Sequence, residues 1–301
     1  MKRFTITGVA GYIAPRHLQA IHDTGNTLVA ALDPHDSVGI LDRWFPEAAF
    51  FTESERFDRY LEKCRRDPGN EIDYLSICAP NYLHDAHIRM ALRSGADAIC
   101  EKPLVLNPWN LNALAELERE AGKRVWTVLQ LRLHPELVQL KKQIRQNSGH
   151  HDVQLTYIAP RGNWYQYSWK GNGEKSGGVI ANIGVHFFDL LHWLFGKRSE
   201  IDLLENNEFT CAGKLELENA SIDWLLSIDP ARMPHSDTKS QIAHRKMCID
   251  GNEVDFSSGF VDLHTAVYQG ILNGEGFGIE DARPAIETIY EIRKLQRGFS
   301  Q

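Results

Sequence analysis

The stretch Lys2-Arg3-Phe4-Thr5-Ile6-Thr7-Gly8-Val9-Ala10-Gly11-Tyr12-Ile13-Ala14 decides the fold of this chain. Its first residues predict a short strand, and the glycine-bearing turn leads into a helical pattern over residues 14–24. A second apolar run over residues 27–32 predicts another strand, which ends at Asp33. A strand, glycine turn, helix, strand and terminal acid within one βαβ unit are typical of a domain that binds a dinucleotide.

The same alternation continues outward from this unit to about residue 131. Further helices are predicted over residues 57–65, 84–94 and 109–121, and further strands over residues 72–78, 98–100 and 124–131. Strands that alternate with helices predict a parallel, doubly wound sheet of the Rossmann type.

After residue 131 the pattern changes to stretches in which apolar and polar residues alternate. Such stretches predict a mostly antiparallel, open sheet. The expected strands are residues 153–158, 211–217, 221–228 and 246–249, and the expected helices are 135–146, 183–194 and 279–295. We therefore predict an α/β Rossmann domain over residues 1–131 and an α+β domain over residues 132–301, whose last helix can pack back on the first domain.

Composition narrows the class of protein. The chain has 301 residues and a net charge of -7, which argues against a general nucleic-acid binder. No run approaches the roughly 18 apolar residues of a membrane span, so no membrane partner is expected. Its five cysteines contain no CxxC pair and fit a reducing cytoplasm, which we predict as the location.

The turn between residues 8 and 14 has the properties of a pyrophosphate site. Residues without bulky side chains let phosphates approach the backbone, and the following helix contributes partial positive charge at its N-terminus. Gly8, Gly11 and Ala14 can serve, although Val9 stands where the G-x-G-x-x-G pattern has its first glycine. The alternative is a tight turn that binds no ligand.

Asp33 ends the second strand, where a carboxylate can accept hydrogen bonds from the adenosine ribose. A carboxylate there would repel a 2′-phosphate, so we predict NAD rather than NADP as the cofactor. The alternative is an aspartate that caps a helix in front of Pro34.

Two more segments follow strands at the same predicted sheet edge. Pro80 fixes a turn, and Asn81 can donate a hydrogen bond to ribose or nicotinamide; an ordinary turn is the alternative. In Glu101-Lys102-Pro103, Lys102 can stabilise negative charge on a reacting hydroxyl, and Glu101 can orient it. By spacing alone, a surface Glu–Lys pair is the alternative.

His84 and His87 are three residues apart and lack acidic or cysteine companions. That spacing predicts a pair on a helix surface rather than a metal site, and we predict no metal ion.

Three motifs carry a resemblance to a known family: Gly11-Tyr12-Ile13-Ala14 with His17, Ala79-Pro80-Asn81 with His84, and Glu101-Lys102-Pro103. They resemble the glucose-fructose oxidoreductase / inositol dehydrogenase / rhizopine catabolism (Gfo/Idh/MocA) family. The resemblance implies a Rossmann domain followed by a domain for substrate binding and oligomerisation, with Lys102 as a catalytic residue. It also implies further cofactor contacts, namely Tyr12, Ile13, His84, Glu101 and Lys102.

The second domain contains a matching pattern in Gly177-Gly178-Val179-Ile180-Ala181-Asn182-Ile183-Gly184-Val185-His186-Phe187-Phe188-Asp189. The spacing of Asn182, His186 and Asp189 predicts that they share one helical face. Asn182 replaces the acid usual in the family, so His186 is the predicted base, since imidazole titrates nearest neutrality. A histidine packed beside Phe187 and Trp193 is the alternative.

A closer resemblance is to one subgroup, the UDP-N-acetyl-glucosaminuronate 3-dehydrogenases of lipopolysaccharide sugar synthesis. It implies oxidation of the sugar C3 hydroxyl to a 3-keto group, re-oxidation of the cofactor by 2-oxoglutarate, and a homotetramer. The segments that carry it are 8–17, 129–132, 161–165, 168–171, 182–186, Gly259-Phe260 and 262–265.

The segment from Arg161 to Lys170 suits an anionic nucleotide sugar. Arg161 and Lys170 can meet a carboxylate or pyrophosphate, and the aromatic residues between them offer planar surfaces. A mobile surface loop or a subunit interface is the alternative. The full set of predicted substrate contacts is Lys102, Arg132, Arg161, Asn163, Trp164, Tyr165, Ser168, Trp169, Lys170, Asn182, His186, Asp189 and His264.

Two other functions remain open from the sequence. One is another sugar or inositol dehydrogenase of the same family, for which the basic residues Arg161 and Lys170 are less suited. The other is a catalytically silent NAD-sensing protein, against which the intact Lys102 and His186 argue.

Overall fold

The computed structural model describes residues 1–147, 149–234, 243–256 and 262–299, so Gly259 and Phe260 lie outside the described residues. The chain forms two compact units. The first contains Met1–Gln130 and Asp262–Ala282, and the second contains Leu131–Val261 and Arg283–Gln301.

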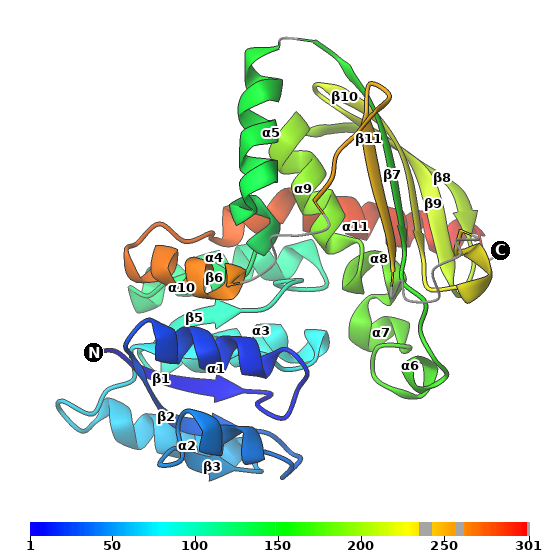
Figure 1. Ribbon diagram of the computed structural model, residues 1–301. Coiled ribbons are helices and arrows are strands. Elements are labelled where there is room, and N and C mark those ends of the chain that lie inside the picture. The colour runs from blue at the N-terminus through cyan, green and yellow to red at the C-terminus, as the bar shows by residue number, and fades with distance from the viewer. Residues whose placement is uncertain (148, 235–242, 257–261, 300–301) are drawn as a thin grey trace. The chain divides into compact units, whose positions relative to one another are not determined.

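The first unit is built on a sheet of six parallel strands in the order β3-β2-β1-β4-β5-β6 (Figure 1). This order is that of a doubly wound dinucleotide-binding fold, so the predicted Rossmann sheet is confirmed. The strands are β1 (Arg3–Thr7), β2 (Thr27–Leu32), β3 (Ala49–Phe51), β4 (Tyr74–Ile77), β5 (Asp97–Cys100) and β6 (Val125–Thr127). The last strand is shorter than predicted, because the chain turns into the short helix η3 (Gln130–Leu133).

Helices connect the strands of this sheet and bury one face each. In α1, His17, Leu18 and Ile21 are buried while Arg16 and Gln19 are exposed, which is the pattern of an amphipathic helix. The helical segments are α1 (Ala14–Asp23), η1 (Gly39–Arg43), α2 (Ser54–Arg65), η2 (Asn81–Leu83), α3 (His84–Arg93) and α4 (Pro108–Ala121).

The sequence did not predict helix α10 (Leu263–Leu272), which belongs to the first unit. Sequence analysis placed residues 262–282 in the second domain. In the structure α10 packs against α1 and buries Leu263, Val267 and Ile271. Because Tyr268 is also fully buried, most of the apolar surface of this helix is used inside the first unit.

The second unit contains a six-stranded sheet in the order β12-β11-β7-β10-β9-β8. Its neighbouring strands are antiparallel except for the parallel pair β7 and β10, which confirms the predicted mostly antiparallel sheet. The strands are β7 (His151–Ile158), β8 (Arg198–Asn206), β9 (Thr210–Leu217), β10 (Ala220–Ser227), β11 (His244–Ile249) and β12 (Asn252–Glu253).

The helices of the second unit include a break that the sequence did not predict. The expected helix over residues 183–194 starts only at Val185, and Asn182 ends the preceding helix, with a bend of 46° between the two helical segments. A Cβ atom at Gly184 would lie 2.3 Å from the carbonyl oxygen of Ile180, so only glycine fits at the break. The helical segments are α5 (Pro135–Gln146), α6 (Trp164–Tyr167), α7 (Gly173–Ser176), α8 (Gly178–Asn182), α9 (Val185–Phe195), η4 (Pro230–Arg232) and α11 (Ile279–Phe299), of which α11 starts in the first unit.

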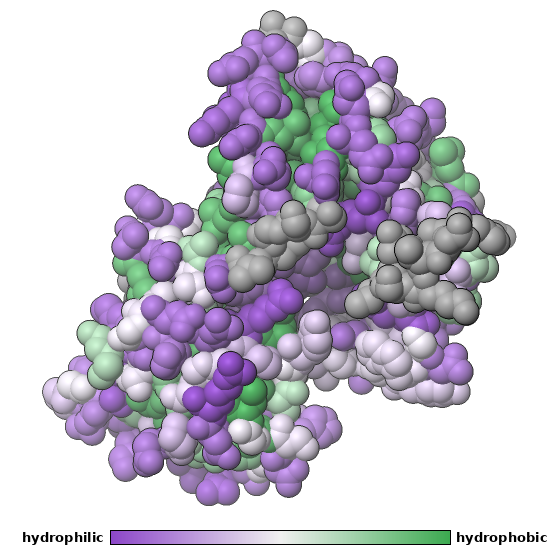
Figure 2. All heavy atoms as spheres, viewed as in Figure 1, coloured by the Kyte–Doolittle hydropathy of each residue, from purple (hydrophilic) through white to green (hydrophobic). Residues whose placement is uncertain are grey.

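Among the described residues, no single helix is long and apolar enough to cross a membrane. The helical segments within residues 173–195 are long and apolar enough only when taken together, but a bend separates them, and most of α9 is buried in the core of its unit. Hydrophilic residues occupy most of the surface that Figure 2 shows.

The buried histidine of α3 predicts a loss of stability in acid. The ring of His87 lies 2.9 Å from the hydroxyl of Thr7, and burial, aided by the neighbouring His84, lowers the pKa of His87 from 6.5 to about 4. The unfolded chain therefore binds a proton that the folded chain does not, and stability falls as the pH drops from 6.5 towards 4. The loss amounts to about 3 kcal/mol at the acid end.

We expect the substitution His87→Asn, which keeps a polar group near Thr7, to flatten this pH dependence. The measurement is the free energy of unfolding in urea between pH 7 and pH 4 for both proteins. If the free energies of unfolding of the wild type and the variant fell in parallel with pH, His87 would not be the cause of the acid sensitivity.

Candidate active site

The glycine turn between β1 and α1 needs residues without side chains. Gly8 has a φ of +78°, and a Cβ atom there would lie 2.5 Å from the carbonyl carbon of Cys78. The amide of Gly11 donates to the carbonyl oxygen of Gly8 at 3.0 Å, and α1 begins at Ala14. The backbone of β1, the turn and β4 thus come together closely at the N-terminus of a helix, which is the arrangement that admits a dinucleotide pyrophosphate.

Asp33 ties the end of β2 to this turn. One carboxylate oxygen accepts from the amide of Ala10 at 3.0 Å, and the other accepts from the amide of His35 at 2.9 Å. Asp33 therefore forms a turn of its own and does not cap a helix, since η1 begins only at Gly39. Each carboxylate oxygen can accept a second hydrogen bond, so the predicted contact with a ribose remains chemically available.

Four further predicted cofactor contacts lie on two loops at the carboxyl ends of neighbouring strands. Tyr12 and Ile13 follow β1, and their side chains are exposed and half-buried, respectively. Pro80 and the buried Asn81 follow β4, which pairs with β1. Adjacent strands thus present both loops at one sheet edge, where open α/β sheets bind ligands.

His84 and His87 are not on the surface, so the interpretation as a surface pair is wrong. Their residues are only 1% and 8% exposed, because both face the interior from α3. The ring of His84 lies between two backbone carbonyls, with Nδ1 2.7 Å from the oxygen of Pro103 and Nε2 2.9 Å from the oxygen of Ala79. Burial lowers the pKa of His84, and its ring atoms contact protein groups rather than being left open for a cofactor.

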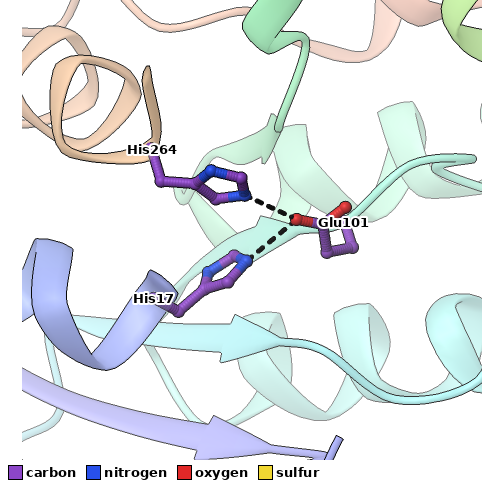
Figure 3. Close-up of side chains that lie close together, drawn as sticks. All are labelled: His17, Glu101 and His264. Atoms are coloured by element: carbon purple, nitrogen blue, oxygen red, sulfur yellow. Dashed lines mark hydrogen bonds and ion pairs between the residues drawn. The ribbon is translucent and has the colours of Figure 1, made fainter. Parts of the chain in front are cut away.

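Glu101 follows β5 and lies in a buried cluster with His17 of α1 and His264 of α10 (Figure 3). One oxygen, Oε1, is 2.9 Å from Nε2 of His17 and 3.1 Å from Nε2 of His264. Burial alone would raise the pKa of Glu101, but the hydrogen bonds from the two histidines outweigh it and hold that pKa well below its usual range. Glu101 is therefore an ionised carboxylate inside the protein, and His264, a predicted substrate contact, binds it.

A second layer of hydrogen bonds supports this cluster. Nδ1 of His17 lies 2.8 Å from the hydroxyl of Tyr268, which in turn lies 2.7 Å from the hydroxyl of Ser76 on β4. Sequence reasoning assigned no chemistry to His17 or Ser76. The signal that could have indicated His17 is its helical spacing, three residues after Ala14 and four before Ile21, which places it on the buried face of α1.

Lys102 is half-buried, and its amide donates to Oε2 of Glu101 at 3.3 Å. The Lys102–Pro103 peptide is cis. The predicted reactive lysine thus lies between Glu101 and Pro103, and buried histidines contact both of these residues.

In the second unit, two predicted substrate contacts bind each other. Arg132 donates to both carboxylate oxygens of Asp189, from Nη2 at 2.7 Å and from Nε at 3.1 Å. Their side chains are 8% and 3% exposed. This two-point ion pair joins η3 to α9, so the structure gives both residues a structural contact that the sequence did not predict.

The bend between α8 and α9 also changes the predicted polar face. Asn182 ends α8 and donates from Nδ2 to the hydroxyl of Tyr165 at 3.1 Å, whereas His186 is half-buried in the first turn of α9. The three residues therefore do not share one continuous helix face, because a helix break lies between Asn182 and His186.

The segment from Arg161 to Lys170 is ordered around its aromatic residues. Tyr165 is buried in α6, and the ammonium of Lys170 lies 5.3 Å from the ring centre of Trp164 and 5.8 Å from that of Trp169. Burial and then the charge of Arg161 lower the pKa of Lys170. Asn163 precedes α6, and the hydroxyl of Ser168 donates to the carbonyl oxygen of Tyr165 at 2.8 Å. The positive charges of Arg161 and Lys170 repel each other, so an anionic ligand between them would be favourable. The exposed indole of Trp164 offers a planar surface for a ring of that ligand.

Comparisons with known proteins agree with this architecture. A family model described as an oxidoreductase family with an NAD-binding Rossmann fold matches residues 2–129. A second, described as the C-terminal alpha/beta domain of an oxidoreductase family, matches residues 149–219. The chain belongs to the Gfo/Idh/MocA oxidoreductase family.

Among solved structures, this member of the family is similar to the WlbA (WbpB) dehydrogenase from Thermus thermophilus. The complex of that enzyme with NAD and UDP-GlcNAcA is 52% identical, with a TM-score of 0.94 over 97% of this chain and 95% of that chain. Its complex with NAD and alpha-ketoglutarate is 53% identical, with a TM-score of 0.95 over 98% and 96%.

A curated relative has a lower sequence identity to this chain than the WlbA (WbpB) dehydrogenase has. The D-glucoside 3-dehydrogenase of Escherichia coli is 27% identical over 127 residues, which are 41% of this chain and 36% of that protein. The match to this relative covers little more than a third of its length.

The buried ion pair of the second unit predicts an asymmetric response to mutation. We expect Asp189→Asn to lower the free energy of unfolding by about 3–5 kcal/mol, because it removes the carboxylate charge that the buried guanidinium of Arg132 binds at two points. The double variant Arg132→Met/Asp189→Leu should recover most of this loss. Urea unfolding followed by tryptophan fluorescence measures both.

The matched control is Glu291→Gln, which breaks an exposed ion pair with Lys294 on the same unit. It should cost about 1 kcal/mol or less. A double variant as unstable as Asp189→Asn would show that the pair does not act through its charges.

Proposed function

We propose that this protein oxidises the C3 hydroxyl of UDP-N-acetyl-glucosaminuronic acid to a 3-keto group, with NAD as hydride acceptor and 2-oxoglutarate as the final oxidant. The observation that carries this proposal is the 52–53% identity over nearly the whole chain to an enzyme crystallised with NAD and either UDP-GlcNAcA or alpha-ketoglutarate. In balance, the sugar loses a hydride and a proton, and 2-oxoglutarate gains both to become 2-hydroxyglutarate.

The residues of the first unit fit NAD. The close approach of backbone at Gly8 leaves no room for a side chain, and α1 begins directly after the turn. Asp33 and Asn81 would hold the ribose groups, and the carboxylate of Asp33 favours a free 2′-hydroxyl. When bound, NAD supplies the acceptor for the hydride of the sugar C3.

His186 and Lys102 divide the remaining chemistry. His186 accepts the proton of the C3 hydroxyl as general base. Lys102 donates a charged hydrogen bond to the same oxygen and stabilises its developing negative charge. Lys102 is suited to this role because the residues on both sides of it are fixed by buried hydrogen bonds.

The segment around α6 supplies the preference for an acidic nucleotide sugar. Arg161 and Lys170 bind the negative groups, and Trp164 and Trp169 lie beside Lys170 with planar surfaces for a base or sugar ring. Asn182 and Tyr165 contribute as a hydrogen-bonded pair, and Asn163 and Ser168 flank α6 at its two ends.

The proposed activity also indicates how the product is used, and the family resemblance indicates an oligomer. A 3-keto sugar is the substrate that a transaminase needs, which suits lipopolysaccharide sugar synthesis in the cytoplasm. We infer a homotetramer whose second units pair through the outer face of the mixed sheet, where Lys214, Asp223 and Lys246 are exposed. Light scattering measures the mass of the assembly and so tests for a tetramer.

Incubation with UDP-N-acetyl-glucosaminuronic acid, NAD and 2-oxoglutarate should yield a 3-keto nucleotide sugar and 2-hydroxyglutarate in equal amounts. Mass spectrometry of both products is the measurement, with myo-inositol and UDP-N-acetyl-glucosamine as matched alternative substrates. Faster turnover of a neutral polyol would assign the protein to another sugar or inositol dehydrogenase. NAD binding without any turnover would indicate a sensing protein.

Single-turnover formation of NADH tests the two residue roles. Lys102→Ala and His186→Asn should each slow it by about 100-fold or more, because each removes a group that acts on the reacting oxygen. Arg161→Gln should raise the KM of the acidic nucleotide sugar and leave that of a neutral polyol unchanged. Lys63→Met, which removes an exposed lysine of α2, is the control. Near wild-type rates in both Lys102→Ala and His186→Asn would contradict the catalytic roles proposed for these two residues.

A further inference from the structure

Three buried histidines hold the two residues that flank Lys102. His17 and His264 bind the carboxylate of Glu101, and the ring of His84 contacts the carbonyl oxygen of Pro103. The histidines come from α1, α10 and α3, so three separate helices of the first unit converge on one short segment. We call His17, His84 and His264 the histidine clamp.

The hydrogen positions in the Glu101 cluster follow from the partners. An ionised carboxylate can only accept, so Nε2 of His17 and Nε2 of His264 must both carry a hydrogen. Burial lowers the pKa of His17 and keeps its ring neutral, so Nδ1 of His17 must accept. The hydroxyl of Tyr268 is therefore the donor to His17, and the hydroxyl of Ser76 is the donor to Tyr268.

Two histidines and a glutamate are also ligands that zinc accepts, and their ligand atoms lie within 4.8 Å of one another. The distances favour hydrogen bonds. Ligand atoms that share a tetrahedral zinc with bonds of about 2.0–2.1 Å lie about 3.3 Å apart. The two nitrogen–oxygen distances here are 2.9 and 3.1 Å, within the range of ordinary N–H···O bonds.

Helix α10 supplies two members of this network from one face. His264 and Tyr268 are four residues apart and both are buried, so they lie one turn above the other. His264 binds Glu101 directly, and Tyr268 acts through His17 by selecting the tautomer that donates to Glu101. The amide of Lys102 in turn donates to the second oxygen of Glu101.

We propose that Tyr268 and His264 are positioning residues for Lys102, which fix its backbone through Glu101 while His84 fixes Pro103 from the other side. This rests on the proposed function, in which Lys102 acts on the reacting oxygen. Neither α10 residue touches that oxygen: their effect is to keep the lysine within the small displacement that hydride transfer tolerates.

Tyr268→Phe removes one hydroxyl and leaves the ring, and His264→Leu removes the donor to Glu101. Both should lower kcat about 10-fold or more, while the KM values for NAD and sugar change less than about 2-fold. His264→Gln, which can place an N–H group where Nε2 stands, should restore at least about half of the wild-type kcat. Tyr74→Phe is the matched control: it removes a tyrosine hydroxyl from the same unit, where the Tyr74 ring stacks on Phe4, and should leave kcat unchanged.

Thermal unfolding of each variant separates loss of fold from loss of position. A kcat of Tyr268→Phe within 2-fold of wild type would overturn the proposal. So would a fall in kcat that Tyr74→Phe reproduces, or one that His264→Gln shares equally with His264→Leu.

Nitrogen-15 NMR of the histidine rings tests the network without any substrate. His17 should show a hydrogen on Nε2 in the wild type and lose this single tautomer in Tyr268→Phe. If the wild type turns over no nucleotide sugar but shows this change, the proposed function fails and the network stands. If His17 carries its hydrogen on Nδ1, or if added Zn²⁺ binds in one equivalent and is lost in His264→Leu, the network as drawn is wrong.

Discussion

The ionised carboxylate of Glu101 is the most demanding feature of the first unit. A charge that is only 6% exposed costs several kcal/mol unless donors replace the lost water. Here the donors are two imidazole N–H groups and the amide of Lys102. Because those imidazoles belong to α1 and α10, the positions of both helices are tied to the end of β5.

The same constraint couples the position of the glycine turn to that of the lysine segment. Helix α1 begins directly after the turn at Gly8 and carries His17 on its inner face. The helix that places positive partial charge at the dinucleotide site thereby also places the histidine that binds Glu101. A shift of α1 would disturb both the predicted cofactor contact and the support of Lys102.

Much of the fold could be predicted from the sequence because its signals are local. Apart from the three-residue strand β3 and the short helices η1 and η2, which were not predicted, the strands and helices up to residue 121 follow from hydrophobic periodicity and the positions of glycines. Strand β8 was missed because its buried positions are few and its sequence is largely charged or exposed. The break before Val185 was missed because a single glycine in a helical pattern has no visible cause until the carbonyl of Ile180 is seen beside it.

For the site, the sequence indicated segments but not partners. The lysine segment and the glycine turn were identifiable because each motif is continuous. Arg132 and Asp189 are 57 residues apart, so the sequence alone does not show that each is the partner of the other. The same holds for Glu101 and His264, which are 163 residues apart.

Helix α10 also gives the chain an order of assembly. Residues 1–130 are synthesised first and carry every strand of the parallel sheet, yet at that stage Glu101 lacks His264, and His17 lacks Tyr268. The buried charge gains its full set of donors only after the strands of the second unit have been made. The dinucleotide-binding unit therefore begins folding first and is completed almost last, and a chain cut after Gln130 would be a weaker protein than its sheet alone suggests.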